Sequence, residues 1–149
     1  MPRAGQRVRA VDFTDAQVSV QTTSGTTTST SYTATLTGGT TCSCVFLAPS
    51  SGRVEIANVA QMSNSGSTFV YCAFEVRTGS SVGSGTVVFA ASDDEALIVA
   101  GSNPFRFGLQ RVVGGLTPGA SYNVRQVFKV QSPGTGTYSR KVLAVKPLP

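Results

Sequence analysis

The chain of 149 residues contains no histidine and no tryptophan, and only seven of its residues are acidic. Histidine is the commonest general base and the commonest metal ligand among side chains, so its absence argues against most hydrolases and metalloenzymes. Serine nucleophiles are plentiful, but no histidine is present to activate one. The sequence therefore predicts a protein that is not an enzyme and that needs no cofactor and no metal.

Long apolar runs are also missing. No run approaches the ~18 residues of a membrane-spanning helix, and the N-terminus carries charge without the apolar segment of a signal peptide. We therefore expect no membrane contact and no secretion by the general pathway. Charged residues make up only 13 % of the chain, while serine and threonine are abundant, a composition typical of surfaces that contact other protein subunits.

The net charge of +5 raises the question of a nucleic-acid partner. Only Arg3, Arg7 and Arg9 cluster, and the other basic residues are scattered along the chain. No stretch interleaves basic and aromatic residues in the way that single-strand binders do. The sequence therefore favours a basic, solvated surface and no nucleic-acid partner.

Three cysteines, Cys42, Cys44 and Cys72, are an odd number. Alternation along a strand places Cys42, Cys44 and Phe46 on one face, where small apolar side chains line a core. A metal would require a second cluster of similar ligands. We expect three unbridged core thiols, which suits folding in a reducing compartment.

The acidic residues form two groups of candidates. The run Asp93-Asp94-Glu95 could hold a hard cation weakly, but consecutive acids without the D-x-D-x-D spacing are more typical of a solvated turn. Glu55 and Glu75 are the remaining carboxylate pair with glycosidase potential. They lie beside Arg53 and Arg77 in alternating segments, which favours cross-strand charge pairs.

Residues 17–149 consist of short alternating runs separated by Gly, Pro, Asn and Ser, at the spacing of about 8–12 residues typical of sandwiches. The expected strands are residues 17–23, 26–37, 41–47, 53–62, 68–77, 85–91, 96–100, 105–113, 121–130 and 137–145. No helix of useful length is expected. The pattern predicts an all-β protein, a single jelly-roll-type antiparallel β-sandwich over residues 17–149.

Residues 1–16 differ from this body. They hold Arg3, Arg7 and Arg9 together with two apolar spots, one over residues 8–11 and one at Phe13. A segment of this length cannot form its own core, so we predict a short N-terminal arm that lies on another surface. The alternation of Val11 and Phe13 suits a short strand added to a sheet edge.

Two turn motifs carry resemblances. Residues 116–124, LTPGASYNV, resemble the tyrosine corner of fibronectin type III domains, in which a tyrosine hydroxyl bonds back to the preceding turn. Residues 46–52, FLAPSSG, resemble the F-x-A-P-x-x-G entry of jelly-roll heads of the complement and tumour-necrosis-factor type. Gly52 permits the tight turn, and Pro49 starts it without needing a ladder donor.

Together, the arm, residues 46–52, residues 74–79 and residues 116–124 resemble small virion proteins of actinobacterial phages and prophages, known as minor tail, fibre or decoration proteins. The resemblance implies a non-enzymatic structural protein of the phage particle, assembled in the host cytoplasm. It also implies a homotrimer with an arm that anchors to other virion proteins. From the composition of the arm, we expect Arg3, Arg7, Arg9, Val11 and Phe13 to make the anchoring contacts.

The resemblance does not distinguish capsid, tail and baseplate. An alternative function is a receptor- or carbohydrate-binding module at a tail-fibre tip that recognises a host-surface glycan. Sugar-binding faces usually present tryptophan or tyrosine for stacking. With no tryptophan and only Tyr32, Tyr71, Tyr122 and Tyr138 available, the composition favours the structural role.

Overall fold

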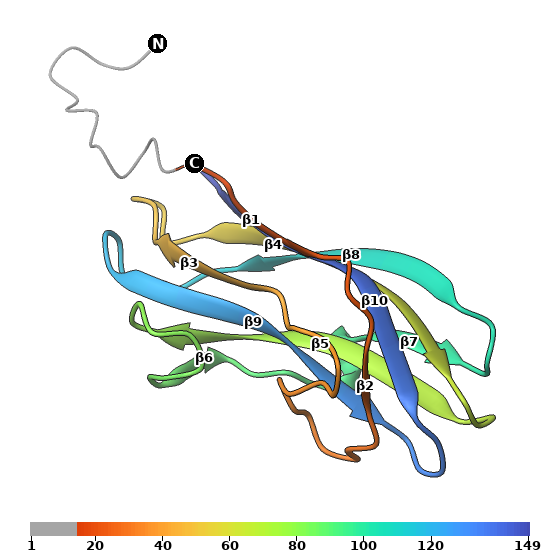
Figure 1. Cartoon of the computed structure of the whole chain (residues 1–149). Coiled ribbons are helices and arrows are strands. Elements are labelled where there is room, and N and C mark those ends of the chain that lie inside the picture. The colour runs from red at the N-terminus through yellow and green to blue at the C-terminus, as the bar shows by residue number, and fades with distance from the viewer. Residues whose placement is uncertain (1–14) are drawn as a thin grey trace, which may run out of the picture.

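Two antiparallel sheets lie face to face in the computed structural model, which describes residues 15–149 (Figure 1). Sheet A contains β1 (Gln17–Gln21), β2 (Gly25–Thr27), β4 (Val54–Asn64), β8 (Phe105–Val113) and β10 (Gly136–Pro147). Sheet B contains β3 (Ser43–Leu47), β5 (Phe69–Thr78), β6 (Val87–Phe89), β7 (Leu97–Ala100) and β9 (Ser121–Val130). A 3₁₀ turn, Asp93–Glu95, precedes β7.

The strand order is that of a jelly roll. Sheet A runs β1-β10-β4-β8 and sheet B runs β3-β9-β5-β6, while β2 also pairs with β10 and β7 also pairs with β5. If β1 with β2, and β6 with β7, are each counted as one interrupted strand, eight strands alternate between the sheets in the orders 1-8-3-6 and 2-7-4-5. This is the double-sheet arrangement of jelly rolls, and it confirms the predicted fold class.

One predicted strand is wrong. Of residues 26–37, only the beginning lies in a strand, β2, and the rest forms turns with isolated bridges from Thr26 to Thr37 and from Thr33 to Phe128. The cause is local: hydroxyl groups accept hydrogen bonds from the backbone two residues later, as Thr27 does from Ser29 and Thr33 does from Thr35, at 3.1 Å in both cases. Such bonds compete with a sheet ladder.

The core between the sheets consists of two apolar clusters. One contains Phe46, Phe74, Val76, Tyr122 and Leu143 among others, and the second contains Met62, Val70, Phe128 and Tyr138 among others. The inward positions of β4 alternate regularly with partly exposed ones along all 11 residues. This period of two is what buries one side of the strand and solvates the opposite side.

Two fully buried amides, Asn58 and Gln126, join the sheets across the core. Gln126 Nε2 donates to Asn58 Oδ1 at 2.7 Å and to the Val59 carbonyl at 3.1 Å. Asn58 Nδ2 donates to the Cys72 carbonyl at 3.1 Å. Gln126 Oε1 has no hydrogen-bond partner within the described residues, so this pair carries an uncompensated desolvation cost.

Both turn motifs adopt the geometry expected of them. The Tyr122 hydroxyl accepts a hydrogen bond from the Thr117 N–H at 2.9 Å, which closes the tyrosine corner. Gly52 has φ +65° and donates its N–H to the Pro49 carbonyl at 2.9 Å. The Leu116 N–H donates to the Gly52 carbonyl at 3.0 Å, so the two turns are tied to each other.

Cys42, Cys44 and Cys72 are free and buried, as predicted. Burial raises the pKa of the Cys44 thiol to about 11 and that of the Cys72 thiol to about 12. Because the thiolate is the reactive and metal-binding form, the thiols are protonated core side chains at neutral pH.

Lys141 is the one fully buried basic residue in the described part of the chain. A β-bulge between Ser139 and Val142, with Arg140 at φ +45°, turns Lys141 inward. Its Nζ donates to the Thr23 carbonyl at 2.8 Å, and burial lowers its pKa. The contact holds the link between β1 and β2 against β10, which is a structural role.

Candidate interaction surfaces

Two neighbouring rows of outward positions, across β1, β10, β4 and β8 of sheet A, are apolar except for Gln110. Outward positions beyond these rows hold the polar side chains of Glu55, Gln61, Arg106 and Lys146. Strand registers align Val20 with Val142, Val142 with Val59, and Val59 with Gly108. A parallel row joins Val18, Ala144, Ala57 and Gln110 in the same way. We call these eight residues the sheet A outer face. Because the outward side of an antiparallel sheet is normally polar, an apolar surface across four strands is typical of a protein contact.

In strand β1 the apolar side chains face outward and the polar side chains face sheet B, which is the reverse of the usual arrangement. Val18 and Val20 are 62 % and 58 % exposed, whereas the polar side chains of β1 lie on the side facing sheet B. There Ser19 Oγ accepts from the Ser43 N–H at 3.3 Å, and Gln21 Oε1 accepts from the Thr40 hydroxyl at 2.7 Å. The sequence pattern predicts that Val18 and Val20 share a face of the strand. The alternation of side chains along a strand does not determine which of its two faces is buried.

The outer face of sheet B holds internally paired charges beside exposed apolar side chains, namely Val45, Leu47, Phe69 and Ile98. Arg125 Nε lies 2.6 Å from Glu75 Oε1 across the strand pair, and Arg77 Nε lies 2.9 Å from the same oxygen. The cross-strand charge pair predicted for Glu75 is therefore confirmed, with Arg125 as the partner across the strands, whereas Arg77 pairs with Glu75 along β5. Glu55 forms no ion pair within the described residues, so the prediction for Glu55 and Arg53 is wrong. Glu55 and Glu75 face outward from different sheets and therefore cannot act together on one substrate.

The Glu75 network makes stability depend on pH. Partial burial raises the pKa of Glu75, but hydrogen bonds and charge from Arg77 and Arg125 outweigh it and hold the pKa below its usual range. A carboxyl whose pKa is lowered by folding contributes stability above its unfolded pKa, and this contribution is lost as pH falls through the folded pKa.

We expect Glu75→Gln to lower the free energy of unfolding at pH 7 by about 1 kcal/mol. The deficit relative to the unmodified protein should shrink as pH falls from about 5 to 3. Urea denaturation across that range measures it. Asp94→Asn, at an exposed acid without an ion pair in the described residues, is the matched control and should change little. A pH-independent deficit would contradict this account.

The acidic run Asp93–Glu95 forms the 3₁₀ turn, and its carboxylates point to separate partners. Asp93 pairs with Lys129 at 2.5 Å and accepts from the Tyr32 hydroxyl at 3.0 Å, while Glu95 pairs with Arg111 at 3.2 Å. Within residues 15–149, no group of three or more His, Cys, Asp or Glu side chains is arranged to hold a metal ion.

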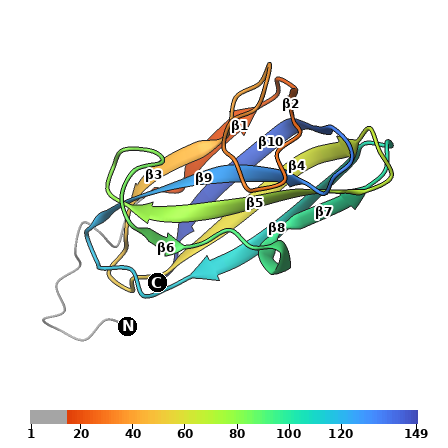
Figure 2. The same cartoon turned by 90° about the horizontal axis from the view of Figure 1, so that it is seen from below.

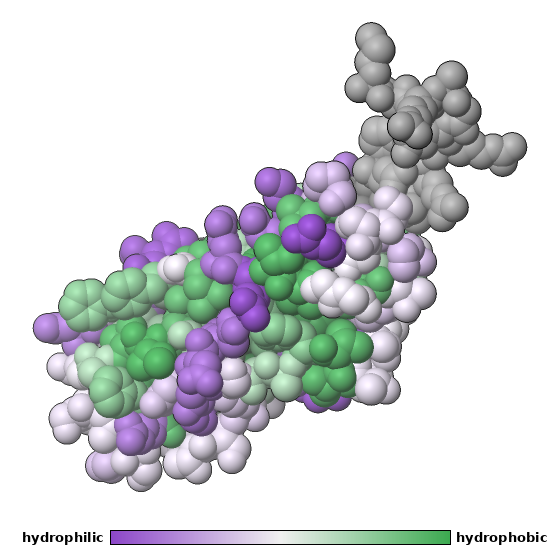
Figure 3. Space-filling view, turned by 180° about the vertical axis from the view of Figure 1, so that it is seen from behind, coloured by the Kyte–Doolittle hydropathy of each residue, from purple (hydrophilic) through white to green (hydrophobic). Residues whose placement is uncertain are grey.

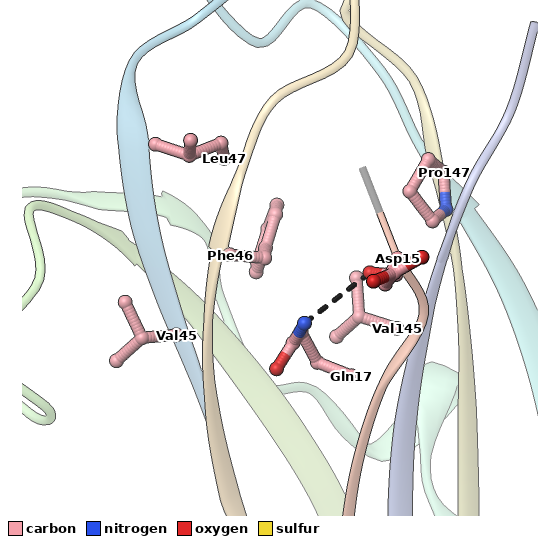
Figure 4. A pocket seen from close by; sticks show the side chains of 7 residues that line it. All are labelled: Asp15, Gln17, Val45, Phe46, Leu47, Val145 and Pro147. Atoms are coloured by element: carbon pink, nitrogen blue, oxygen red, sulfur yellow. Dashed lines mark hydrogen bonds between the residues drawn. The ribbon is translucent and has the colours of Figure 1, made fainter. Parts of the chain in front are cut away.

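A shallow hollow of about 260 Å³ lies at the corner where the described chain begins (Figure 4). Its lining comes from β1, β3 and β10 and their flanks: Asp15, Gln17, Val45, Phe46, Leu47, Val145 and Pro147. Figure 4 shows the Gln17 side chain bonded to the Asp15 carbonyl across this corner, at 3.3 Å. The described chain therefore begins at the edge of the sandwich where β1 and β3 lie.

The second apolar surface lies along β8, on the side seen in Figure 3, where hydrophobic patches alternate with hydrophilic side chains. Phe105 and Phe107 are 50 % and 46 % exposed and stack with ring centroids 6.0 Å apart. They align with Met62 and Ala60 on β4, so both rings lie on the core side of sheet A. The strands of sheet B do not bury them fully. The sequence pattern identifies the strand but not this exposure.

The predicted anchoring residues Arg3, Arg7, Arg9, Val11 and Phe13 lie outside the described residues. Residues 15–149 contain no helix that is long and apolar enough to cross a membrane.

Comparisons with known proteins place the fold in context. No family model matches the chain, and no curated protein matches it. Among solved structures, the chain is similar to a chain in the structure of infectious bursal disease virus, Gx strain, with a TM-score of 0.54 and 14 % identity. The similarity covers 99 % of this chain but only 38 % of the viral chain. The protein is therefore a jelly-roll β-sandwich of a kind also found in a virus structure, and at this identity the likeness concerns the fold alone.

Proposed function

We propose that this protein is a non-enzymatic structural component of a bacteriophage particle, as a capsid decoration or as part of a tail or fibre. The observation that carries the proposal is the mostly apolar sheet A outer face on a jelly-roll body, with Val18 and Val20 62 % and 58 % exposed. An exposed apolar face of this kind suits a subunit that packs on a neighbouring protein. The likeness in fold to a chain of a virus structure supports the proposal.

In this proposal the N-terminal arm anchors the body to another virion protein. Arg3, Arg7 and Arg9 bind a surface of that protein that is rich in carboxylates or carbonyl groups, because Arg forms strong bidentate pairs with carboxylates. Val11 and Phe13 enter an apolar groove or add to a sheet edge. The described chain begins at Asp15 in the corner hollow beside β1, so in this proposal one neighbour holds both the arm and the sheet A outer face.

Deleting residues 2–13 should leave the melting temperature of the body within about 2 °C of the full chain, since the strand pairing begins at Gln17. Incorporation into particles, measured by mass spectrometry of purified virions, should fall at least about tenfold. A double variant, Val18→Asp with Val20→Asp, tests the sheet A outer face separately and should also reduce incorporation while folding normally. Normal incorporation of both variants would refute the proposal, and unfolding of the deletion variant would refute the role of the arm.

A further inference from the structure

Strand β8 has a free edge along its whole length. It pairs with β4 on one side, from Phe105 opposite Met62 to Val113 opposite Val54. No strand within residues 15–149 pairs with its other side, and Figure 2 shows β8 at the border of the sandwich. Eight of its nine residues are partly or fully exposed. Native proteins usually shorten or guard an edge strand of this kind, because it is a template for pairing with another chain.

Two core-side residues at this edge, Phe105 and Phe107, are not fully buried by sheet B. Phe105 and Phe107 point toward sheet B, but β7, the strand opposite them, has only four residues. Its inward residues Leu97 and Val99 pack into the core cluster of Met62. The two phenylalanine rings are left about half exposed, and such aromatic area is stabilised when a second surface removes it from water.

We propose that a second copy of this chain pairs with β8 in antiparallel orientation about a two-fold axis at Leu109. This inference concerns self-association and goes beyond the proposed role in the particle. The register that pairs all nine residues puts Phe105 opposite Val113 of the second copy and Phe107 opposite Arg111 of the second copy. It keeps the inward side chains of both copies on one side and joins the two sheet A outer faces into one continuous surface.

Charge complementarity favours this register. Arg106 lies opposite Val112 of the second copy, and Val112 is the neighbour of Glu55 on β4 within each chain. Strands two apart are separated by about 9.6 Å, a distance that an arginine and a glutamate side chain span together. Neither Arg106 nor Glu55 has an ion pair within the described residues of one copy. The two-fold axis forms this pair twice, and it places no two arginines directly opposite each other.

Size-exclusion chromatography with light scattering on the full chain tests the contact. A mass of twice 15.4 kDa is expected at about 100 µM, whereas the trimer expected from the sequence would have three times that mass. Phe107→Lys should raise the dissociation constant at least about tenfold. Phe69→Lys, at a residue 44 % exposed on β5, is the matched control and should leave the dimer intact. A monomer or a trimer of the unmodified chain would overturn the proposal.

A charge exchange tests the register itself. Arg106→Glu alone should weaken the dimer, because it places two glutamates near each other at each end of the contact. Arg106→Glu combined with Glu55→Arg should restore it. Circular dichroism confirms that each variant is folded. Failure of the double variant to restore the dimer would overturn the assigned register.

Discussion

Asn58→Leu is expected to lower the free energy of unfolding by about 2–3 kcal/mol, because it removes the partner of a buried amide. Gln126 would lose its shortest hydrogen bond, that of 2.7 Å to Asn58 Oδ1, in a site where its Oε1 already lacks a partner. Gln126→Met is expected to cost a similar amount, since Asn58 Oδ1 would keep only the weak Cys72 thiol donor at 3.7 Å.

The double variant, Asn58→Leu with Gln126→Met, is expected to be less destabilised than either single variant. It replaces both amides with apolar side chains of similar length, so that no buried polar group is left unpaired. Urea denaturation of the four proteins closes the double-mutant cycle. If the two single costs simply add, the amides do not act as a pair and the explanation fails.

Gly52→Ala is expected to cost about 3 kcal/mol. Part of this cost, about 1–2 kcal/mol, is the strain of a Cβ at positive φ. The rest arises because the Cβ would clash with the Leu116 carbonyl oxygen. The turn would have to move away from residue 116, and the hydrogen bond from the Leu116 N–H to the Gly52 carbonyl would be lost.

Gly115→Ala is the matched control for Gly52→Ala. Gly115 has φ +76°, but a Cβ there would meet nothing within 4 Å. Its substitution should therefore cost only the strain, about 1 kcal/mol. Thermal unfolding of both variants separates the free-energy cost of backbone strain from the cost of the clash with Leu116. Equal costs would show that the contact between the two turns contributes nothing to stability.

The sequence predicts those parts of this fold that depend on local patterns. Nine of the ten expected strands occur near the predicted positions, since alternation and turn residues are local signals. The strand predicted over residues 26–37 is wrong. A composition rich in β-branched residues does not reveal that threonine and serine hydroxyls will form hydrogen bonds with the nearby backbone.

The candidate surfaces could be predicted only in part. Alternation along β1 puts Val18 and Val20 together, yet only the assembled sheets show that this side faces away from the core. The exposure of Phe105 and Phe107 depends on the shortness of β7, a strand from another part of the chain. Inward-facing Asn58 and Gln126 are likewise a property of the packed sheets, which no single segment encodes.

The rates at which the three buried thiols are alkylated report where the folded chain opens. Alkylating reagents attack the thiolate, so a cysteine reacts only in molecules that have opened around it. Cys72 lies between the sheets and would be labelled when the sandwich separates. Cys42 lies near Ser19 of β1 and would be labelled when that edge opens by itself. Comparing the two labelling rates would show whether the edge beside the N-terminal segment opens more readily than the body to which it is attached.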